Sequence, residues 1–211
     1  MILKAEDVAE RLEKGLKPED KDPLVISPHS DIKTIRESGS ASIDLRLGSW
    51  FVNLRKAKIE KIEIGQSEHE SQLTETHYVP FGDKYLLHPR SFVLGITLEW
   101  LRLPKDLSAY VIGKSSWGRR GLIIATATGV HPGFPGCLTL ELTNVGEIPI
   151  PLQPGMEICQ IFFHEVASPP SKHIDQSQFV GSRKPKLGKI KPDKIADRLA
   201  KAQLDEDSTS P

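Results

Sequence analysis

Apolar residues recur along most of this chain in short alternating runs. From residue 85 onward these runs are separated by turns that contain proline or glycine, and they span Tyr85–His88, Phe92–Trp100, Ser108–Ile112, Leu122–Thr126, Leu138–Thr143 and Met156–Phe163. Alternation of apolar and polar residues is typical of strands with one buried face. Because no helical period lies between the runs, the pattern predicts an all-β sandwich or barrel and not a sheet of alternating β and α units.

A helical period occurs near the N-terminus. Between Ala5 and Gly15 the apolar residues fall three or four positions apart, which predicts a short amphipathic helix. Residues 17–40 contain three prolines and one apolar cluster, at residues 24–26, so we expect a loop with a short strand there. Residues 56–77 are rich in charge, and we expect a hairpin or a long loop that leaves the core.

The segment Ser40–Val52 is predicted to be a half-buried strand with two different faces. The apolar residues at positions 43, 45 and 47 share one face, and Asp44 and Arg46 share the other. We expect Asp44 and Arg46 to form an ion pair across strands or between subunits. A direct catalytic role for Asp44 is the less favoured alternative.

The composition changes after His164, where apolar residues become rare and Lys, Arg, Gly and Pro become frequent. We therefore divide the chain into a β domain over residues 1–165 and a C-terminal arm over residues 166–211. The arm is expected to gain order against another surface. A final helix is predicted within Asp193–Leu204.

The overall charge excludes several kinds of partner. Lys+Arg and Asp+Glu are equal at 28 each, so no global positive field exists to bind nucleic acid or an anionic membrane, and an anionic ligand must be bound locally.

No apolar run is long enough to cross a bilayer, and the first residues are charged where a signal peptide is apolar; we expect a cytosolic protein. Cys137 and Cys159 are expected to be small core residues.

A basic, hydroxyl-rich turn follows the strand predicted at Ser108–Ile112. It comprises Gly113, Lys114, Ser115 and Ser116, with Arg119 three residues later. Such a turn offers backbone N–H groups, hydroxyls and cations to phosphate oxygens. It lacks the first glycine of a Walker A loop, and by itself it is most simply interpreted as an ordinary polar turn.

A single carboxylate lies on the strand predicted at Leu138–Thr143. Strict alternation places Glu141 beside Thr139 and Thr143, opposite the leucines. For an isolated glutamate, the simplest interpretation is a solvent-facing residue. The order of the neighbouring motifs favours a functional one.

Taken in order, these segments resemble the dCTP deaminase branch of the dUTPase-like superfamily. The resemblance rests on GKSSWGRRGL, a G-V-x-P-G-F-x-G turn, TLELTN and a P-G-M-x-I-x-Q-I-x-F strand, preceded by MILKAEDVAERLEKG, SASIDLRLG and LHPRSFVLGITLEWLRLP. It covers about residues 1–165, and the ordered set is more specific than any one motif.

The resemblance implies a distorted β-barrel of the β-clip type, in a homotrimer with active sites between subunits and the arm closing over bound nucleotide. It implies hydrolytic deamination of dCTP to dUTP and ammonia in pyrimidine deoxynucleotide metabolism, with dUTP and dTTP as further candidate ligands. Glu141 would be the general base and acid, and Ser115 and Arg119 would position the water and the glutamate. The residues implied to bind substrate are Lys114, Ser115, Ser116, Trp117, Gly118, Arg119, Ala127, His131, Thr139, Leu140, Glu141, Gln160, Gln178 and Ser182.

The chemistry is compatible with a metal-independent reaction. Attack on C4 of cytosine needs a proton removed from water and protons delivered to N3 and to the departing amino group, which one carboxylate can do. Zinc deaminases need an H-x-E motif with P-C-x-x-C, and no H-x-E occurs here. We expect no zinc, and Mg²⁺ only as a companion of the triphosphate.

Two departures from the family pattern keep alternatives open. His131 stands where an aspartate is usual, and Gln178, Phe179 and Ser182 stand where the arm usually has lysine, tyrosine and glutamine. The missing aspartate argues against pyrophosphatase activity. The alternatives are a dUTPase, a bifunctional deaminase and dUTPase, and a nucleotide-binding regulator without catalysis.

Overall fold

The computed structural model describes residues 1–55, 73–125, 129–167, 181–189, 193–196 and 198–199. Across these residues the protein is mainly β, with few helices, as the alternating pattern predicts. The helices are α1 (Ala5–Gly15), α2 (Ile32–Glu37) and α4 (Ser115–Gly118). The strands are β1 (Val25–Ser27), β2 (Ile43–Arg46), β3 (Trp50–Leu54), β4 (Thr74–Tyr78), β5 (Tyr85–Leu87), β6 (Phe92–Ile96), β7 (Trp100–Arg102), β8 (Leu107–Gly113), β9 (Leu122–Ile124), β10 (Gly129–Val130), β11 (Pro135–Gly136), β12 (Thr139–Asn144), β13 (Ile150–Leu152) and β14 (Glu157–Glu165).

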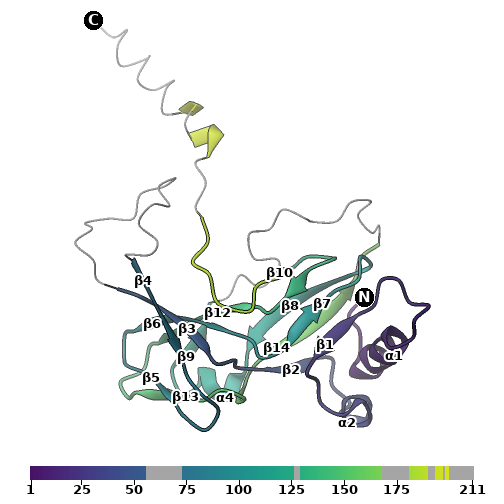
Figure 1. The fold of residues 1–211 in the computed structure, drawn as a ribbon, viewed down its shortest axis with the longest axis horizontal. Helices are drawn as coiled ribbons and strands as arrows, with labels where there is room; N and C mark the ends of the chain where they lie inside the picture. Colours follow the sequence, from purple (N-terminus) through teal and green to yellow (C-terminus); the bar gives the residue numbers. More distant parts are fainter. Residues whose placement is uncertain (56–72, 126–128, 168–180, 190–192, 197, 200–211) are drawn as a thin grey trace, which may run out of the picture.

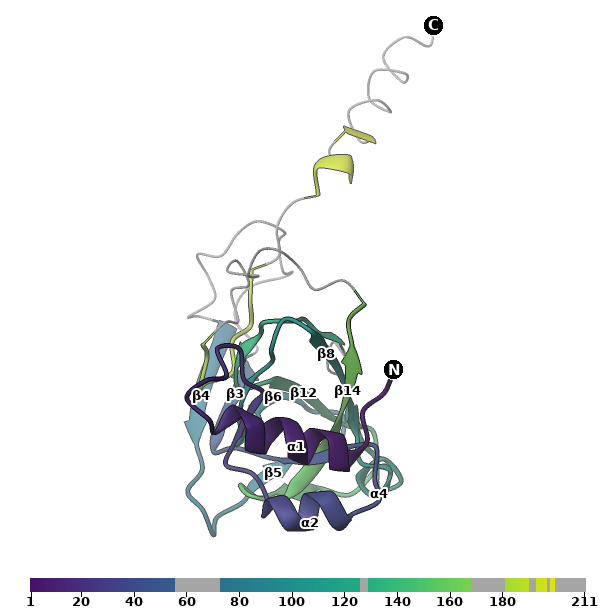
Figure 2. The same ribbon diagram turned by 90° about the vertical axis from the view of Figure 1, so that its right-hand side faces the viewer.

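Within the described residues the strands form four sheets, and every pairing is antiparallel (Figure 1). The strand orders are β1-β7-β11, β10-β8-β14-β2, β4-β3-β6-β12-β9 and β13-β5. Helix α1 lies across one end of this β structure with α2 beside it (Figure 2). The sheets of the described residues do not close into a barrel, so the expected distorted barrel is observed only as a mainly β architecture.

Two segments predicted as single strands are each divided between sheets. Ser40–Val52 contains β2 and the start of β3, which belong to different sheets, with Gly48 between them. A Cβ atom on Gly48 would lie 3.0 Å from Cγ2 of Ile96 and 3.1 Å from the carbonyl oxygen of Thr97, so a larger residue would force these neighbours to move and the close crossing favours glycine. Phe92–Trp100 likewise contains β6 and the start of β7, which belong to different sheets.

The helical prediction is confirmed at the N-terminus and incomplete after it. Helix α1 has the predicted bounds, and it buries its apolar stripe, namely Ala5, Val8, Ala9 and Leu12. The short strand expected near residues 24–26 is β1. The prediction of loop for the rest of residues 17–40 is wrong at α2, which buries Ile35, because a helix with so small a buried face leaves little periodicity to detect. Cys137 and Cys159 are buried, as expected.

Part of the C-terminal arm packs against the β structure. The N–H of Gly181 donates to the carbonyl oxygen of Pro135 at 2.8 Å, and the N–H of Cys137 donates to that of Ser182 at 3.0 Å. The Lys184 ammonium lies 3.8 Å from the centroid of the Trp50 ring, a cation–π contact. Residues 181–184 are therefore held against β11 and the start of β3.

Two other expected segments are only partly described. Of the excursion expected at residues 56–77, residues 56–72 lie outside the described ranges, and Thr74–Tyr78 form β4 alongside β3. Of the helix predicted within Asp193–Leu204, residues 194–196 and 198–199 are helical. None of the helices in the described part of the chain is long and apolar enough to cross a membrane.

Candidate functional site

The predicted catalytic carboxylate lies on β12 with the orientation that the alternation predicts. Leu140 and Leu142 are fully buried, whereas Glu141 is half-buried on the opposite face. Glu141 is paired in register with Leu94 of β6, and its carbonyl oxygen accepts the N–H of Ala125 at 2.9 Å. The backbone of β12 is therefore held from both sides, which limits the positions that the Glu141 side chain can reach.

The basic turn after β8 is a single helical turn, α4, whose start is tied to β14. The backbone N–H of Lys114 donates to the carbonyl oxygen of Ile158 at 3.1 Å, and the indole N–H of Trp117 donates to that of Glu157 at 3.0 Å. Trp117 is half-buried against the core, whereas Ser115, Ser116, Gly118 and Arg119 are exposed. Trp117 thus anchors α4 and leaves its hydroxyls and the Arg119 guanidinium facing outward.

The ammonium of Lys114 binds two carboxylates of its own chain. Its Nζ lies 2.7 Å from Oδ2 of Asp44 and 2.7 Å from Oε2 of Glu157. Burial lowers the pKa of Lys114, but the hydrogen bonds to these two carboxylates outweigh that effect, and the pKa is raised above its usual value. Lys114 therefore remains a cation, with two of its three N–H donors already engaged.

Asp44 connects this lysine to a second predicted binding residue. The Gln160 side chain on β14 donates from Nε2 to Oδ1 of Asp44 at 3.0 Å. Burial raises the pKa of the Asp44 carboxyl, but the hydrogen bonds from Lys114 and Gln160 outweigh it, so the pKa lies below its usual value. Both carboxylate oxygens of Asp44 thus accept hydrogen bonds from residues that the sequence analysis expects to bind the substrate.

Further charges extend the cluster toward the core. The Arg46 guanidinium lies 3.3 Å from Glu99, whose side chain is 1% exposed, and 3.8 Å from Glu157. Burial raises the pKa of Glu99, and its hydrogen bonds with Arg46 partly offset this. Asp44 and Arg46 do not form the expected ion pair with each other: Asp44 pairs with Lys114, and Arg46 pairs with Glu99 and Glu157. Sequence reasoning did not single out Glu99 or Glu157, although both lie within segments that carry the family resemblance, because their partners are distant in the chain.

The remaining predicted substrate residues differ in how exposed their side chains are. Thr139 is half-buried on the same face of β12 as Glu141, whereas the Leu140 side chain is fully buried, so only its backbone could contact a ligand. His131 is exposed directly after β10. Ser182 is buried, and its hydroxyl donates to the carbonyl oxygen of Lys184 at 2.6 Å. Ala127 and Gln178 lie outside the described residues.

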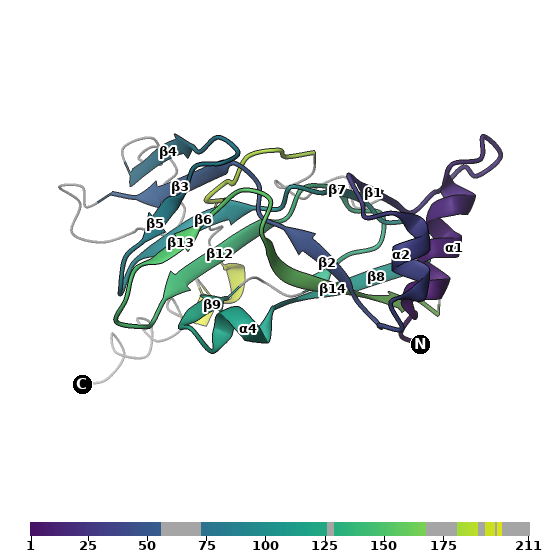
Figure 3. The same ribbon diagram turned by 90° about the horizontal axis from the view of Figure 1, so that it is seen from below.

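The structure brings these residues together in two adjoining groups. Gln160 belongs to the sheet that contains β2, β8 and β14, and Lys114 directly follows β8, whereas Thr139 and Glu141 belong to the sheet that contains β12. Helix α4 packs against β9, the neighbour of β12. Figure 3 shows α4 between the two groups.

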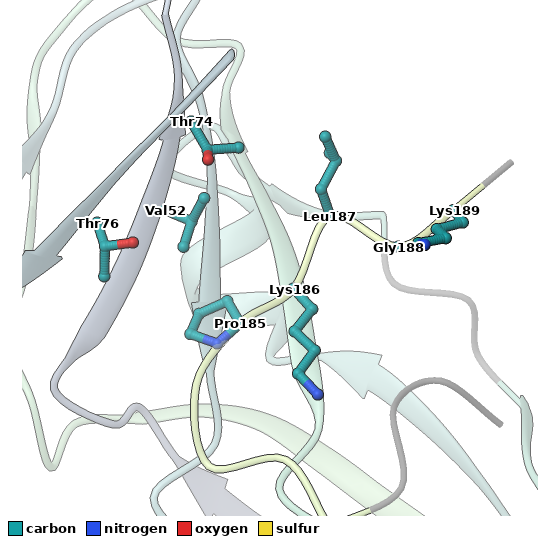
Figure 4. A pocket seen from close by; sticks show the side chains of 8 residues that line it. All are labelled: Val52, Thr74, Thr76, Pro185, Lys186, Leu187, Gly188 and Lys189. Atoms are coloured by element: carbon teal, nitrogen blue, oxygen red, sulfur yellow. The ribbon is translucent and has the colours of Figure 1, made fainter. Parts of the chain in front are cut away.

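Two cavities lie elsewhere, next to the arm. One of about 350 Å³ lies between the arm and strands β3 and β4 (Figure 4) and is lined by Val52, Thr74, Thr76, Pro185, Lys186, Leu187, Gly188 and Lys189. Another of about 500 Å³ has Trp50, Tyr78, Trp100 and Arg183 among its lining residues. Neither is lined by Lys114 or Glu141. Within the described ranges, no group of three or more His, Cys, Asp or Glu residues is arranged to hold a metal ion.

Comparison with known proteins decides the family, because residues 2–166 match the family described as dCTP deaminase-like. The chain belongs to this family. A dCTP deaminase of Halorubrum lacusprofundi is 39% identical over 170 residues, which cover 80% of this chain and 79% of the relative. A protein of Dictyoglomus thermophilum named "dCTP deaminase, dUMP-forming" is 41% identical over 170 residues, which cover 80% and 82%.

A solved structure agrees with the fold of this dCTP deaminase-like chain. The 2'-deoxycytidine 5'-triphosphate deaminase of Agrobacterium tumefaciens superposes with a TM-score of 0.56 at 24% identity. The match covers 78% of this chain and 48% of the other. At this identity the likeness concerns the fold.

Proposed function

We propose that this chain is an enzyme that deaminates the cytosine of dCTP by hydrolysis. The observation that carries the proposal is membership of the dCTP deaminase-like family over residues 2–166, and Glu141 lies half-buried on the face of β12 opposite its leucines. Lys114, Ser115 and Arg119 lie at α4, next to the strand that neighbours β12. The combination supports a nucleotide held at α4 with its base directed to β12.

In the proposed reaction Glu141 moves protons and forms no covalent bond. Its carboxylate accepts a proton from water, the oxygen attacks C4 of cytosine, and the proton is delivered to N3. Glu141 then takes the proton of the new C4 hydroxyl and passes it to the amino group, the C4–N bond breaks as C4=O forms, and dUTP and ammonia leave. This cycle requires the bound nucleotide to exclude water from Glu141, so that the side chain can donate a proton as well as accept one.

Ser115 and Arg119 are proposed to position the water and the Glu141 carboxylate. Both are exposed on α4, which is anchored through Trp117. The triphosphate would carry Mg²⁺ as its companion, and this ion would neutralise phosphate charge without entering the deamination. We propose no zinc.

A homotrimer with sites between subunits is part of the proposal. Exposed apolar side chains on the two relevant sheets, Tyr110, Ile112 and Ile123, offer area for contact with another copy. Glu141 lies on β12, whereas α4 directly follows β8 of another sheet, and a second subunit could complete the site. Sedimentation of the purified protein measures the state directly, and a monomer at working concentration would contradict the trimer.

A second candidate is a bifunctional enzyme that releases dUMP. It is favoured by relatives named "dCTP deaminase, dUMP-forming", such as that of Dictyoglomus thermophilum. His131, which stands where the family usually has aspartate, argues against it. If the chain also hydrolyses the triphosphate, dUMP and pyrophosphate accumulate in place of dUTP.

The test is incubation of the purified protein with dCTP and Mg²⁺ while cytosine absorbance and ammonia are followed. Chromatography of the products separates dUTP from dUMP and so distinguishes the two candidates. We expect Glu141→Gln to lower kcat by about 10²-fold or more, because general acid–base catalysis contributes that much. Glu147→Gln, at an exposed glutamate after β12, is the matched control.

The outcomes are distinct. Absence of turnover by the wild-type protein, or turnover undiminished in Glu141→Gln, would refute the proposed deaminase. Nucleotide-induced thermal stabilisation without product would favour a regulator that binds nucleotide.

A further inference from the structure

Asp44 contacts two predicted substrate residues, Lys114 and Gln160, which lie far from it and from each other in the sequence. It is paired in register with Gln160 on β14, and Gln160 is paired in turn with Ile112 on β8. Asp44, Gln160 and Ile112 thus form one row across the sheet. Lys114 follows Ile112 two positions later in the chain. The carboxylate of Asp44 is thus close enough to contact both Lys114 and Gln160.

The two oxygens of this carboxylate are used separately. Oδ2 accepts from Nζ of Lys114 at 2.7 Å, and Oδ1 accepts from Nε2 of Gln160 at 3.0 Å. An ionised carboxylate accepts and does not donate, so it fixes which end of the Gln160 amide points toward it. Asp44 therefore sets the place of a cation and the orientation of an amide at the same time.

We propose that Asp44 is a positioning residue of the nucleotide site, which holds Lys114 and Gln160 in the arrangement that binds substrate. This inference rests on the proposed function for the identity of the nucleotide, dCTP. Asp44 itself needs no contact with the nucleotide. Its role passes through the two side chains that it holds.

The charges around Lys114 indicate that Asp44 positions this lysine and does not merely compete with phosphate for its ammonium. Lys114 keeps Glu157 as a second carboxylate at 2.7 Å, so loss of Asp44 does not leave the ammonium unpaired. What is lost is the link between Lys114 and Gln160. If Asp44 instead only competed with phosphate for the ammonium, its removal would tighten nucleotide binding.

The test measures the Kd of dCTP by calorimetry in a Glu141→Gln background, so that binding is measured without turnover. We expect Asp44→Asn to weaken binding about tenfold, in keeping with the loss of a hydrogen bond to a charged group. In the otherwise wild-type protein the same change should raise KM about tenfold and alter kcat by less than about twofold, because neither Lys114 nor Gln160 takes part in the proton transfers.

The matched control is Asp106→Asn. It removes an ion pair of the same length, 2.7 Å to Arg11, between side chains that are 40% and 31% exposed. Asp106 precedes β8 and Lys114 follows it, so the two lie about 25 Å apart at the usual strand rise. Asp106→Asn should leave Kd and KM unchanged.

A double-mutant cycle separates positioning from general destabilisation. In a Lys114→Met background Asp44→Asn should weaken binding by clearly less than tenfold, because the contact between Asp44 and residue 114 is already lost and only the contact with Gln160 remains. Additive effects, an unchanged Kd, or tighter binding in Asp44→Asn would overturn the inference. If this variant does not fold, the smaller Asp44→Ser replaces it, and failure of both to fold would show that the role is structural.

The inference and the proposed function fail in different ways. Wild-type protein that binds dCTP without turning it over contradicts the deaminase and leaves the Kd comparison decisive for Asp44. Normal turnover with unaltered KM in Asp44→Asn contradicts the inference and leaves the deaminase intact. Absence of both binding and turnover of dCTP in the wild-type protein would overturn both.

Discussion

Replacement of Asn144 by alanine tests how the end of the catalytic strand is held. Asn144 is the last residue of β12 and is fully buried. Its Nδ2 donates to the carbonyl oxygens of Leu87 and Ile148 at 3.0 and 2.9 Å, and its Oδ1 accepts the N–H of Gly146 at 2.9 Å. One side chain thus joins β12 to β5 and to the turn that leads to β13.

The magnitude follows from these three hydrogen bonds. Each contributes about 1 kcal/mol net, and a buried group left without a partner costs about 1–3 kcal/mol. Asn144→Ala should therefore lower the free energy of unfolding by about 3 kcal/mol. Asn144→Asp retains the acceptor for Gly146 but loses both donors, so it should also destabilise the protein, by about 2 kcal/mol or more.

Urea unfolding followed by fluorescence measures both variants. The midpoint should fall while the slope with urea stays constant, since the unfolded surface is the same. Gln153→Ala, at an exposed residue of the next turn, serves as the control. A loss below about 1 kcal/mol in Asn144→Ala would refute the reasoning, because the bonds would then add little beyond what water offers.

Two further predictions concern ionisable groups. The pKa of Asp44 is lowered on folding, so its contribution to stability is present above its unfolded pKa of about 3.9 and is lost as the pH falls through the lower folded pKa; Asp44→Asn should flatten the acid side of a plot of stability against pH, and an unaltered plot would contradict this. Burial raises the pKa of the Cys159 thiol to about 12, so a thiol reagent at pH 8 should label Cys159 only after unfolding, and rapid labelling of Cys159 in the native protein, located by mass spectrometry, would contradict the buried position.

Local patterns predicted the elements whose side chains alternate between core and solvent. The bounds of α1 follow from the spacing of Val8 and Leu12, and the orientation of Glu141 follows from the leucines on either side of it. In both cases the burial of one face requires apolar residues at a fixed spacing, so this spacing can be recognised directly in the sequence. The same period cannot show which sheet a run joins, as on either side of Gly48, because sheet membership depends on partner strands that are distant in the chain.

The candidate site was predictable as a set of residue types but not as a set of contacts. The GKSS segment and Glu141 were identified from their motifs, whereas the carboxylates that bind Lys114 come from residues 44 and 157. No sequence rule links positions so far apart. Trp117 was expected to bind substrate, and the structure shows its indole N–H bound to the backbone of Glu157.

The sequence by itself therefore determined the mainly β class, the helix α1, the face of β12 that carries Glu141, and the family. These depend on periodicity and on motifs that are local in the chain. Only the tertiary structure decided that β2, β8 and β14 lie side by side and bring Asp44, Lys114 and Gln160 within hydrogen-bond distance. Pairing between distant strands is selected by the fit of the whole core, and that fit is not contained in any single segment.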